Sequence, residues 1–282
     1  MLAAVALFAL MDTGLKILSP HYPALQVATL RGLAALPLVL AWSLASIGVR
    51  GLLRVHWPLH LLRGALGVAL MAGFVFGLRT LPLSTAYAIS FVAPLLVTAM
   101  AVPILGEKVG PRRWAAIVVG LVGVLVVLRP TGQGMMTLGG LAILGAAVCY
   151  AASAITVRVL AQRDSTQAMV FWLMLMLAVG AGALSWHDWL PVQPGHWWVI
   201  AGIGVVGTLA QVLLTEAFRR GEASMIAPLE YTALVWGVLL DVALWQVLPD
   251  GMTWLGAAII VASGLYLIKR ERVRAVTPVI DS

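Results

Sequence analysis

The sequence predicts an all-helical integral membrane protein with ten transmembrane helices, arranged as two halves of five that insert in opposite orientations. Three observations support this prediction. Of the 282 residues, 62% are hydrophobic and only 10% are charged, with a mean hydropathy of +1.01, whereas a soluble domain has about 25% charged residues. Apolar stretches of membrane-spanning length follow one another along the whole chain. Basic residues concentrate at alternate ends of these stretches.

Ten apolar segments remain when the chain is divided where basic residues, prolines and glycines cluster. Each is close to the roughly 20 residues that a helix needs to cross a bilayer. In the first half the segments cover roughly 1–18, 23–47, 57–78, 82–105 and 111–129. In the second half they cover roughly 137–158, 165–186, 195–218, 222–248 and 250–268. The loops between them are too short to form a soluble catalytic domain.

The basic residues predict the orientation of the chain, because Lys and Arg favour cytoplasmic loops. Strict alternation of the spans assigns to one side Arg50, Arg54, Arg63, Lys108, Arg112, Arg113, Arg158, Arg163, Arg219, Arg220, Lys269, Arg270, Arg272 and Arg274. The opposite side receives Lys16, Arg79 and Arg129, and Arg31 lies within a span. We therefore expect a multi-pass protein of the cell inner membrane with both termini in the cytoplasm.

The two halves carry similar markers at an offset of 140 residues. Arg79 aligns with Arg219, Ser84 with Ser224, Phe91 with Tyr231, Trp114 with Trp254, and Arg129 with Lys269. Because each half has an odd number of spans, the second half must insert upside down, which is the architecture of many secondary transporters. The predicted division is a first repeat at 1–130, a second repeat at 131–270 and a cytoplasmic C-terminal tail at 271–282.

The composition also excludes several functions. The net charge of +7 follows from the topology, and no charge cluster alternates with aromatic residues, so no nucleic-acid partner is expected. A single cysteine, Cys149, excludes an intramolecular disulfide and a cysteine-based metal cluster. No phosphate-binding loop, nucleophile elbow or metal-ligand motif is present. We therefore predict no enzyme activity, no cofactor and no metal.

Two further spacings concern helix packing and the cytoplasmic turns. Gly73 and Gly77 in the third span have the four-residue spacing that lets helices approach closely. His56 and His60 are also four residues apart, but Pro58 lies between them and they fall beside a turn. We interpret the two histidines as interfacial residues rather than metal ligands.

Short motifs recur near the end of each half. In the first half they are Leu81-Pro82-Leu83-Ser84-Thr85-Ala86, Ala93-Pro94, Leu105-Gly106-Glu107-Lys108, Trp114 and Gly120-Leu121-Val122-Gly123. In the second half they are Ala217-Phe218-Arg219-Arg220-Gly221-Glu222-Ala223-Ser224, Ala227-Pro228-Leu229-Glu230-Tyr231, Trp254-Leu255-Gly256 and Ala262-Ser263-Gly264.

With these motifs the chain resembles the EamA-type transporters of the drug/metabolite transporter superfamily. Its length resembles that of the bacterial amino-acid and metabolite exporters, including the YddG-like aromatic amino-acid exporter branch. The resemblance implies ten helices around a central cavity that opens alternately to the two sides of the membrane. One departure is that Gly106-Glu107 aligns with Gln246-Val247 at the 140-residue offset, so a role of this glutamate is not duplicated.

Acidic residues within the spans are candidate functional residues, because ionisable groups are costly at membrane depth. These acids are Asp12, Glu216, Glu230 and Asp241. Glu230 and Asp241 are eleven residues apart, which on an α-helix places them within about 20° on one face. We expect this face to border the cavity, where the acids bind a substrate amine, carry a coupling proton or join helices by hydrogen bonds. Glu216 precedes Arg219 and Arg220 by three and four residues, which predicts a local ion pair.

Asp12 has two candidate partners. Lys16 follows four residues later on the same helix face, and Arg31 lies across the tight turn at 19–23, within the second span. We therefore expect an Asp12–Arg31 or Asp12–Lys16 ion pair, or a role of Asp12, Arg31 and Asp241 in coupling.

The predicted substrate site lies on the fourth and ninth spans. Ser90-Phe91 aligns with Glu230-Tyr231 at the 140-residue offset, near the repeat interface where inverted-repeat transporters build their sites. Most tryptophans lie near span ends, as in an interfacial belt, but Trp172 and Trp236 lie deeper. The predicted substrate-binding residues are Tyr87, Ser90, Phe91, Glu230, Tyr231 and Trp236. The alternative is ordinary aromatic packing around the prolines of these spans.

These features predict a secondary transporter, and specifically an exporter, of small amphipathic metabolites such as amino acids, including aromatic ones. An apolar cavity accepts a side chain while one or two polar groups hold the charged end. The alternatives are an organic-cation, drug or vitamin transporter of the same fold and, from a different class, an intramembrane lipid-modifying enzyme or a passive channel. The expected partners are a small-molecule substrate and the lipid bilayer, and a monomer is favoured.

Overall fold

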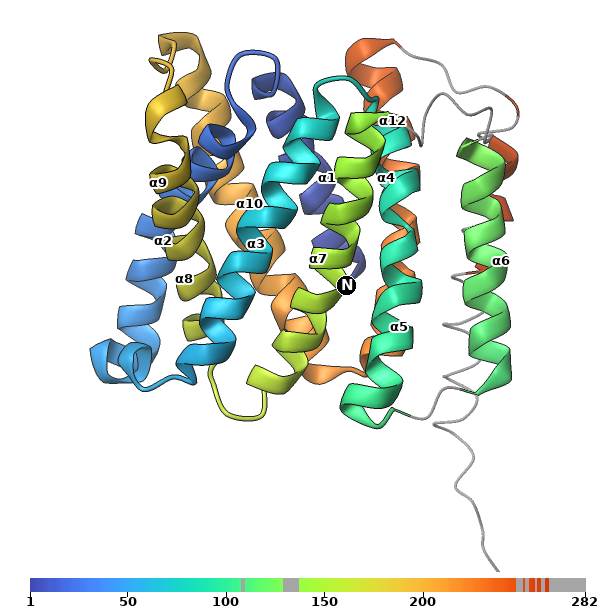
Figure 1. Cartoon of the computed structure of the whole chain (residues 1–282), viewed down its shortest axis with the longest axis horizontal. Helices are drawn as coiled ribbons and strands as arrows, with labels where there is room; N and C mark the ends of the chain where they lie inside the picture. The colour runs from blue at the N-terminus through green and yellow to red at the C-terminus, as the bar shows by residue number, and fades with distance from the viewer. Residues whose placement is uncertain are drawn as a thin grey trace, which may run out of the picture.

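Figure 1 shows a computed structural model of the chain, in which helices pack side by side in a bundle. The structure describes residues 1–107, 110–128, 137–246, 251, 254–256, 258–259 and 262–263, and no strand occurs among them. Within this part of the chain, six helices are long and apolar enough to cross a membrane. The predicted all-helical membrane fold is therefore confirmed for the described residues. The tenth predicted span, 250–268, and the tail at 271–282 fall largely or wholly outside them, so the count of ten helices stays a prediction.

The first half folds close to the predicted segments. Its helices are α1 (Leu2–Leu18), α2 (Ala24–Leu53), α3 (Trp57–Leu78), α4 (Leu83–Ser90), α5 (Val92–Leu105) and α6 (Pro111–Leu128). α2 is longer than predicted, but Gly48 has a φ of 64° and breaks the regular helix where the predicted span ends. Gly106 ends α5 in the left-handed conformation that glycine adopts without strain.

The second half has more interruptions. It contains α7 (Leu138–Leu160), α8 (Thr166–Met176), the π-helix η1 (Leu177–Ala181), α9 (Gly182–Ser185), α10 (Trp197–Arg220), α11 (Ala223–Ile226), the 3-10 helix η4 (Ala227–Thr232) and α12 (Ala233–Trp245). Short 3-10 turns, Trp186–Asp188 and Pro194–His196, lie between α9 and α10. The side chains of Thr137 and Ser165 cap α7 and α8 by accepting from the backbone N–H of Gly140 and Ala168.

The ninth predicted span is not one continuous α-helix, because η4 separates α11 from α12. Pro228 has no backbone N–H to donate, and a 3-10 helix turns every three residues rather than every 3.6. The angle predicted between Glu230 and Asp241 assumed a regular α-helix, so that assumption is wrong. Glu230 belongs to η4 and Asp241 to α12.

The core lies between the two halves of the chain. α3 packs along α7, α1 along α10, and α2 along α8 and α10. In Figure 1, α3 and α7 lie next to each other at the centre of the view. Each of these pairs joins a helix from the first half to a helix from the second half, so the space between the halves is surrounded by both.

The contact between α3 and α7 depends on glycine. A Cβ atom added at Gly73 would lie 2.7 Å from the carbonyl oxygen of Ala142, and one added at Gly77 would overlap the side chain of Ile143. The backbone of α7 therefore approaches α3 as closely as the glycine spacing predicts.

We expect Gly73→Ala to lower the stability of the bundle by about 1–3 kcal/mol, because a backbone carbonyl cannot move aside as a flexible side chain does. The matched control is Gly145→Ala on α7, where an added Cβ meets nothing within 4 Å. Thermal unfolding of the purified protein in detergent measures both variants. Equal effects of the two substitutions would show that close α3–α7 packing is not what the glycine provides.

Candidate functional site

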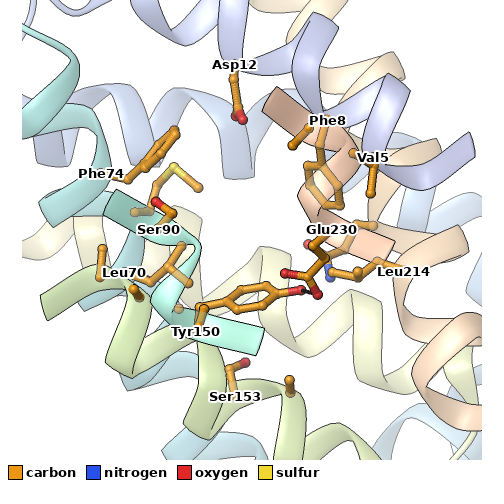
Figure 2. Close-up of a pocket in the computed structure, with 18 of the residues that line it drawn as sticks. Val5, Phe8, Asp12, Leu70, Phe74, Ser90, Tyr150, Ser153, Leu214 and Glu230 are labelled. Carbon is orange, nitrogen blue, oxygen red and sulfur yellow. Dashed lines mark hydrogen bonds between the residues drawn. The ribbon is translucent and has the colours of Figure 1, made fainter. Parts of the chain in front are cut away.

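A central cavity of about 210 Å³ lies between the helices, and its wall is mostly apolar. The described residues that line it come from α1, α2, α3, α4, α5, α7, α8, α10, η1, η4 and α12, with Met1 and Phe91 flanking α1 and α4. Phe8, Leu70 and Phe74 belong to the apolar wall. Figure 2 shows Asp12, Ser90, Tyr150 and Glu230 arranged around this space on different helices. The arrangement provides an apolar chamber with a few separate polar groups, as small-molecule sites commonly have.

On α7 and α10 the cavity extends from the middle of the bundle toward one end. At that end its lining includes Val157 and Phe218, close to the last residues of α7 and α10. Toward the opposite end, the lining on these two helices stops at Ala146 and Gln211, well inside both. The end that the cavity approaches is the one where the sequence predicts the cytoplasmic loops.

Glu230 is held in the cavity by a tyrosine. The hydroxyl of Tyr150 on α7 donates a hydrogen bond of 2.6 Å to Oε1 of Glu230 on η4. In Figure 2, Tyr150 extends across the cavity toward this carboxylate. Tyr150 was not among the site residues predicted from the sequence. The sequence feature that could have indicated this residue is a tyrosine in the middle of an apolar span, in a chain that has only five tyrosines.

Asp12 also accepts from a tyrosine rather than forming either predicted ion pair. The hydroxyl of Tyr87 on α4 donates to Oδ2 of Asp12 at 2.8 Å. Arg31 donates to the side-chain oxygen of Gln211 at 3.3 Å and to the sulfur of Met71 at 3.5 Å. The expected Asp12–Arg31 and Asp12–Lys16 pairs are thus wrong, because the rotation of α1 brings Asp12 to the hydroxyl on α4.

Lys16 instead reaches Asp241, with 3.2 Å between Nζ and Oδ1. Asp241 is buried and also accepts from the backbone N–H of Ser84 at 3.1 Å. The ammonium of Lys16 lies 4.2 Å from the centre of the Trp245 ring. Asp241 does not line the cavity. Its geometry is that of an acid joining α1, α4 and α12.

The aromatic candidates divide into two groups. Phe91 lines the cavity and packs edge to face against Tyr231, with ring centres 5.2 Å apart. Tyr231 is buried behind Phe91, does not line the cavity, and its hydroxyl has no hydrogen-bond partner in the described part of the chain. Trp236 is 40% exposed and lies outside the cavity, and Trp172 donates to the carbonyl of Leu52 instead of lining it.

The structure therefore brings some predicted site residues together and separates others. The cavity is shared by Asp12, Arg31, Tyr87, Ser90, Phe91 and Glu230. Tyr231, Trp236 and Asp241 lie outside its lining. The hydroxyl of Ser90 donates to the carbonyl of Ala86 at 2.9 Å, so it is already engaged within its own helix turn.

Arg63 lines the cavity, although the orientation prediction counted it among the basic residues of the cytoplasmic side. It belongs to α3, is 2% exposed and lines the cavity. Its guanidinium donates to the carbonyl of Met169 at 2.6 Å. α3 begins at Trp57, as predicted, so Arg63 lies more than one helical turn inside the helix and not in a cytoplasmic loop.

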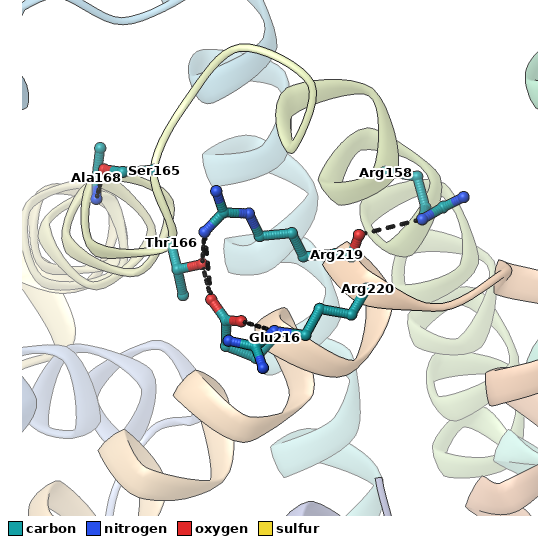
Figure 3. Close-up of polar contacts among 7 residues, drawn as sticks. All are labelled: Arg158, Ser165, Thr166, Ala168, Glu216, Arg219 and Arg220. Atoms are coloured by element: carbon teal, nitrogen blue, oxygen red, sulfur yellow. Dashed lines mark hydrogen bonds and ion pairs between the residues drawn. The ribbon is translucent and has the colours of Figure 1, made fainter.

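At the end nearest Val157 and Phe218, polar side chains join α7, α8 and α10, as Figure 3 shows. The predicted ion pairs of Glu216 are confirmed, with Arg220 at 2.7 Å and Arg219 at 3.4 Å. Glu216 also accepts a hydrogen bond from Thr166. Arg158 donates to the carbonyl of Arg219 at 3.3 Å.

The two histidines near this end are not equivalent surface residues. His60 is 2% exposed and lies 2.9 Å from the carboxylate of Asp164, which also accepts from the backbone N–H of His56. His60 is therefore buried within the protein by the turn after α7, and its position at the membrane interface stays a prediction. Among the described residues, no group of three His, Cys, Asp or Glu side chains has an arrangement that holds a metal ion.

Comparison with known proteins gives consistent matches over nearly the whole chain. The model of the EamA-like transporter family matches residues 1–129 and 137–269. A riboflavin transporter of Vibrio cholerae is 30% identical over 96% of this chain and 92% of its own length. A pseudopaline exporter of Pseudomonas aeruginosa is 26% identical over 94% of this chain and 93% of its own length.

An S-adenosylmethionine uptake transporter of Rickettsia bellii is 30% identical over 76% of this chain and 73% of its own length. A solved crystal structure has a TM-score of 0.77 with 22% identity and covers 98% of both chains, a likeness that concerns the fold alone. None of these matches singles out the YddG-like branch, which stays a prediction.

Proposed function

This chain belongs to the EamA-like transporter family, and from that premise we propose that it exports small amphipathic metabolites, chiefly amino acids including aromatic ones, by alternating access. The family and the names of the relatives make it a transporter of small molecules in a membrane rather than an enzyme. The observation that carries the proposal is the central cavity, which combines an apolar and aromatic wall with the carboxylate of Glu230 and the guanidinium of Arg31.

Substrate contacts are assigned to the residues that share the cavity. Phe74 and Phe91 offer apolar surface to a side chain, and Glu230 with Tyr150 offers a carboxylate to an amine. Tyr231 does not contact the substrate in this proposal; its ring packs against Phe91 and holds that side chain in place. Trp236 has no substrate contact in this proposal, since it lies outside the lining.

Alternating access is supported by the difference between the two ends of the bundle. Beyond the end of the cavity opposite Val157 and Phe218, one set of contacts joins the two halves, and we call it the outer network. Its members are the Lys16–Asp241 ion pair, the Tyr22–His196 hydrogen bond of 2.7 Å and the paired hydrogen bonds of Gln26 with the backbone of Leu190. In the proposed cycle these contacts seal the outer side while the cavity faces the cytoplasm, and they break when it faces outward.

The same proposal keeps the predicted organisation of the chain. Residues 1–130 and 131–270 form two inverted repeats, followed by the tail at 271–282, in a monomer of the inner membrane with both termini in the cytoplasm. The separate family matches over 1–129 and 137–269 support the division. The basic loops at the end that the cavity approaches support the orientation.

A vitamin transporter is the second candidate. The relative from Vibrio cholerae named as a riboflavin transporter favours it, because its match extends over 96% of this chain. An organic-cation or drug transporter of the same fold is a further variant that the carboxylate of Glu230 would suit.

Counter-flow in proteoliposomes tests the proposal. Vesicles are loaded with single unlabelled amino acids, riboflavin or an organic cation, and entry of labelled phenylalanine or riboflavin is followed. We expect internal amino acids to accelerate the entry of labelled phenylalanine, since an alternating-access carrier exchanges its substrates. Acceleration of riboflavin alone would replace amino-acid export by the vitamin alternative, and entry without acceleration would indicate a channel. Protein-free vesicles and the Trp236→Ala variant, altered outside the cavity, serve as controls.

A further inference from the structure

Two arginines line the central cavity without forming an ion pair with a described acid. Arg31 on α2 and Arg63 on α3 are 5% and 2% exposed. Neither has a carboxylate of a described residue within 4.0 Å, and the Nε atom of each is buried without a hydrogen-bond partner. A buried charge that is not paired is costly. Such a group facing a cavity therefore indicates that something else in the transport cycle balances it.

The contacts of Arg31 leave much of its donor capacity unused. A guanidinium has five N–H donors. Those of Arg31 meet one amide oxygen, of Gln211 at 3.3 Å, and one sulfur, of Met71 at 3.5 Å, which is a weak acceptor. The nearby acid of the cavity, Asp12, already accepts from Tyr87.

Arg63 differs from Arg31 in position and in anchoring. Its guanidinium donates a short hydrogen bond of 2.6 Å to the main chain at Met169. Met71, which contacts Arg31, lies eight residues further along α3, which corresponds to about 12 Å along the helix axis. The two guanidinium groups therefore lie at different depths in the cavity, so they do not bind one small anion together. Arg31 lies beside Asp12, Tyr87 and Gln211, in the inner part of the cavity.

We propose that Arg31 is the anion-binding residue of the cavity and that the substrate carries a carboxylate, which the free donors of the Arg31 guanidinium bind. This inference rests on the proposed transport function and narrows its substrate class to zwitterions. The planar fork of an arginine matches a carboxylate. The lining contains two acids, Asp12 and Glu230, and two arginines, so a substrate with one positive and one negative group adds no net charge. Glu230 and Tyr150 receive the amine, and Arg31 with Gln211 receives the carboxylate.

The test uses the purified full-length protein in detergent and pairs of ligands that differ only in the carboxylate. The pairs are L-phenylalanine with L-phenylalaninamide and L-leucine with L-leucinamide, and riboflavin is added as a ligand without a carboxylate. Binding to the folded state raises the melting temperature with ligand concentration, which gives an affinity for each probe. We expect each amino acid, and not its amide, to raise the melting temperature of the wild-type protein.

Two variants assign this preference to a residue. In Arg31→Gln the affinity for the amino acids should fall about tenfold to a hundredfold, as for loss of a hydrogen bond to a charged group, and the preference for acid over amide should disappear. The matched control is Arg63→Gln, another buried arginine of the same cavity, which should keep the preference. Without ligand, Arg31→Gln should melt close to the wild-type temperature, because it removes a buried charge that forms no ion pair but also the positive charge beside Asp12. An arginine with a purely structural role would lower it.

The other outcomes contradict the proposal in distinguishable ways. Stabilisation by the amides or riboflavin as strong as that by the acids overturns the anion site and leaves the transport function intact. Loss of the preference in Arg63→Gln, with Arg31→Gln unaffected, moves the site to the other arginine and overturns the assignment. Absence of stabilisation by every probe, together with absence of counter-flow, overturns both the anion site and amino-acid transport.

Discussion

Glu230→Gln is expected to reduce amino-acid counter-flow roughly tenfold to a hundredfold, the effect of losing a hydrogen bond that involves a charged group. The substitution keeps the size of the side chain and the hydrogen bond with Tyr150, but it removes the negative charge that faces the cavity. An amine then finds no carboxylate opposite it, and a proton cannot be carried at this position. Initial rates of counter-flow in proteoliposomes, measured over a range of external pH, give the size of the effect.

Two matched variants make the result specific to Glu230. Tyr150→Phe removes only the hydroxyl that holds the carboxylate, so we expect a smaller loss than for Glu230→Gln. Glu216→Gln changes an acid of the same type that lies outside the cavity lining and is paired with Arg219 and Arg220, so its counter-flow should stay near the wild-type rate. Besides Glu230 and Tyr150, the ionisable groups of the lining are the side chains of Asp12, Tyr87, Arg31 and Arg63 and the amino group of Met1, and all of these are unchanged in the variants.

An unchanged rate and unchanged pH dependence in Glu230→Gln would contradict both roles of this glutamate. A loss of rate with retained pH dependence would keep the amine contact and exclude the coupling proton. A loss of both is the result expected if one carboxylate serves substrate and proton in turn.

Lys16→Met is expected to lower the stability of the folded protein by about 3 kcal/mol, because it leaves the carboxylate of Asp241 buried without a cation. The side chain of Asp241 is 3% exposed, and its other hydrogen bond, from the backbone N–H of Ser84, does not supply a charge. The contact of the ammonium with the Trp245 ring is lost as well. Thermal unfolding in detergent, with all samples in the same lipid and detergent mixture, measures the change.

The double variant Lys16→Met, Asp241→Asn separates the ion pair from the packing of the lysine chain. We expect it to recover most of the lost stability, since no unpaired charge remains and the asparagine oxygen still accepts from Ser84. Lys16→Arg, which keeps the charge, should be close to wild type. A double variant no more stable than Lys16→Met alone would show that the stability comes from packing of the lysine chain and not from its charge.

Helix positions were the part of the fold that local sequence predicted well. The predicted spans at 57–78, 82–105 and 111–129 correspond to α3, to α4 with α5, and to α6 within one residue at each end. Hydropathy and helix-ending residues act over a few neighbouring positions, so a sequence window contains the relevant information. The 3-10 helix η4 was not predicted, because a proline within a span is compatible with several backbone structures.

The candidate site was predicted in part, and the residues that were missed have a common reason. Tyr87, Ser90, Phe91 and Glu230 reach the cavity as expected, but Tyr150 and Arg63 were overlooked. Tyr150 meets Glu230 across 80 positions of the chain, and Lys16 meets Asp241 across 225. Such partners depend on the rotation of each helix about its axis and on which helices become neighbours.

The amino-acid sequence by itself thus determined that the chain is a multi-span helical membrane protein, where most helices begin and end, and that few polar groups lie at membrane depth. These properties are sums over local residues. The tertiary structure alone decided that Asp12 accepts from Tyr87, that Lys16 pairs with Asp241, and that Arg31 faces the cavity without forming an ion pair with a described acid. Packing between helices, both within a half and between the halves, sets these pairings, because the close approach of helices such as α3 and α7 fixes which side chains can meet.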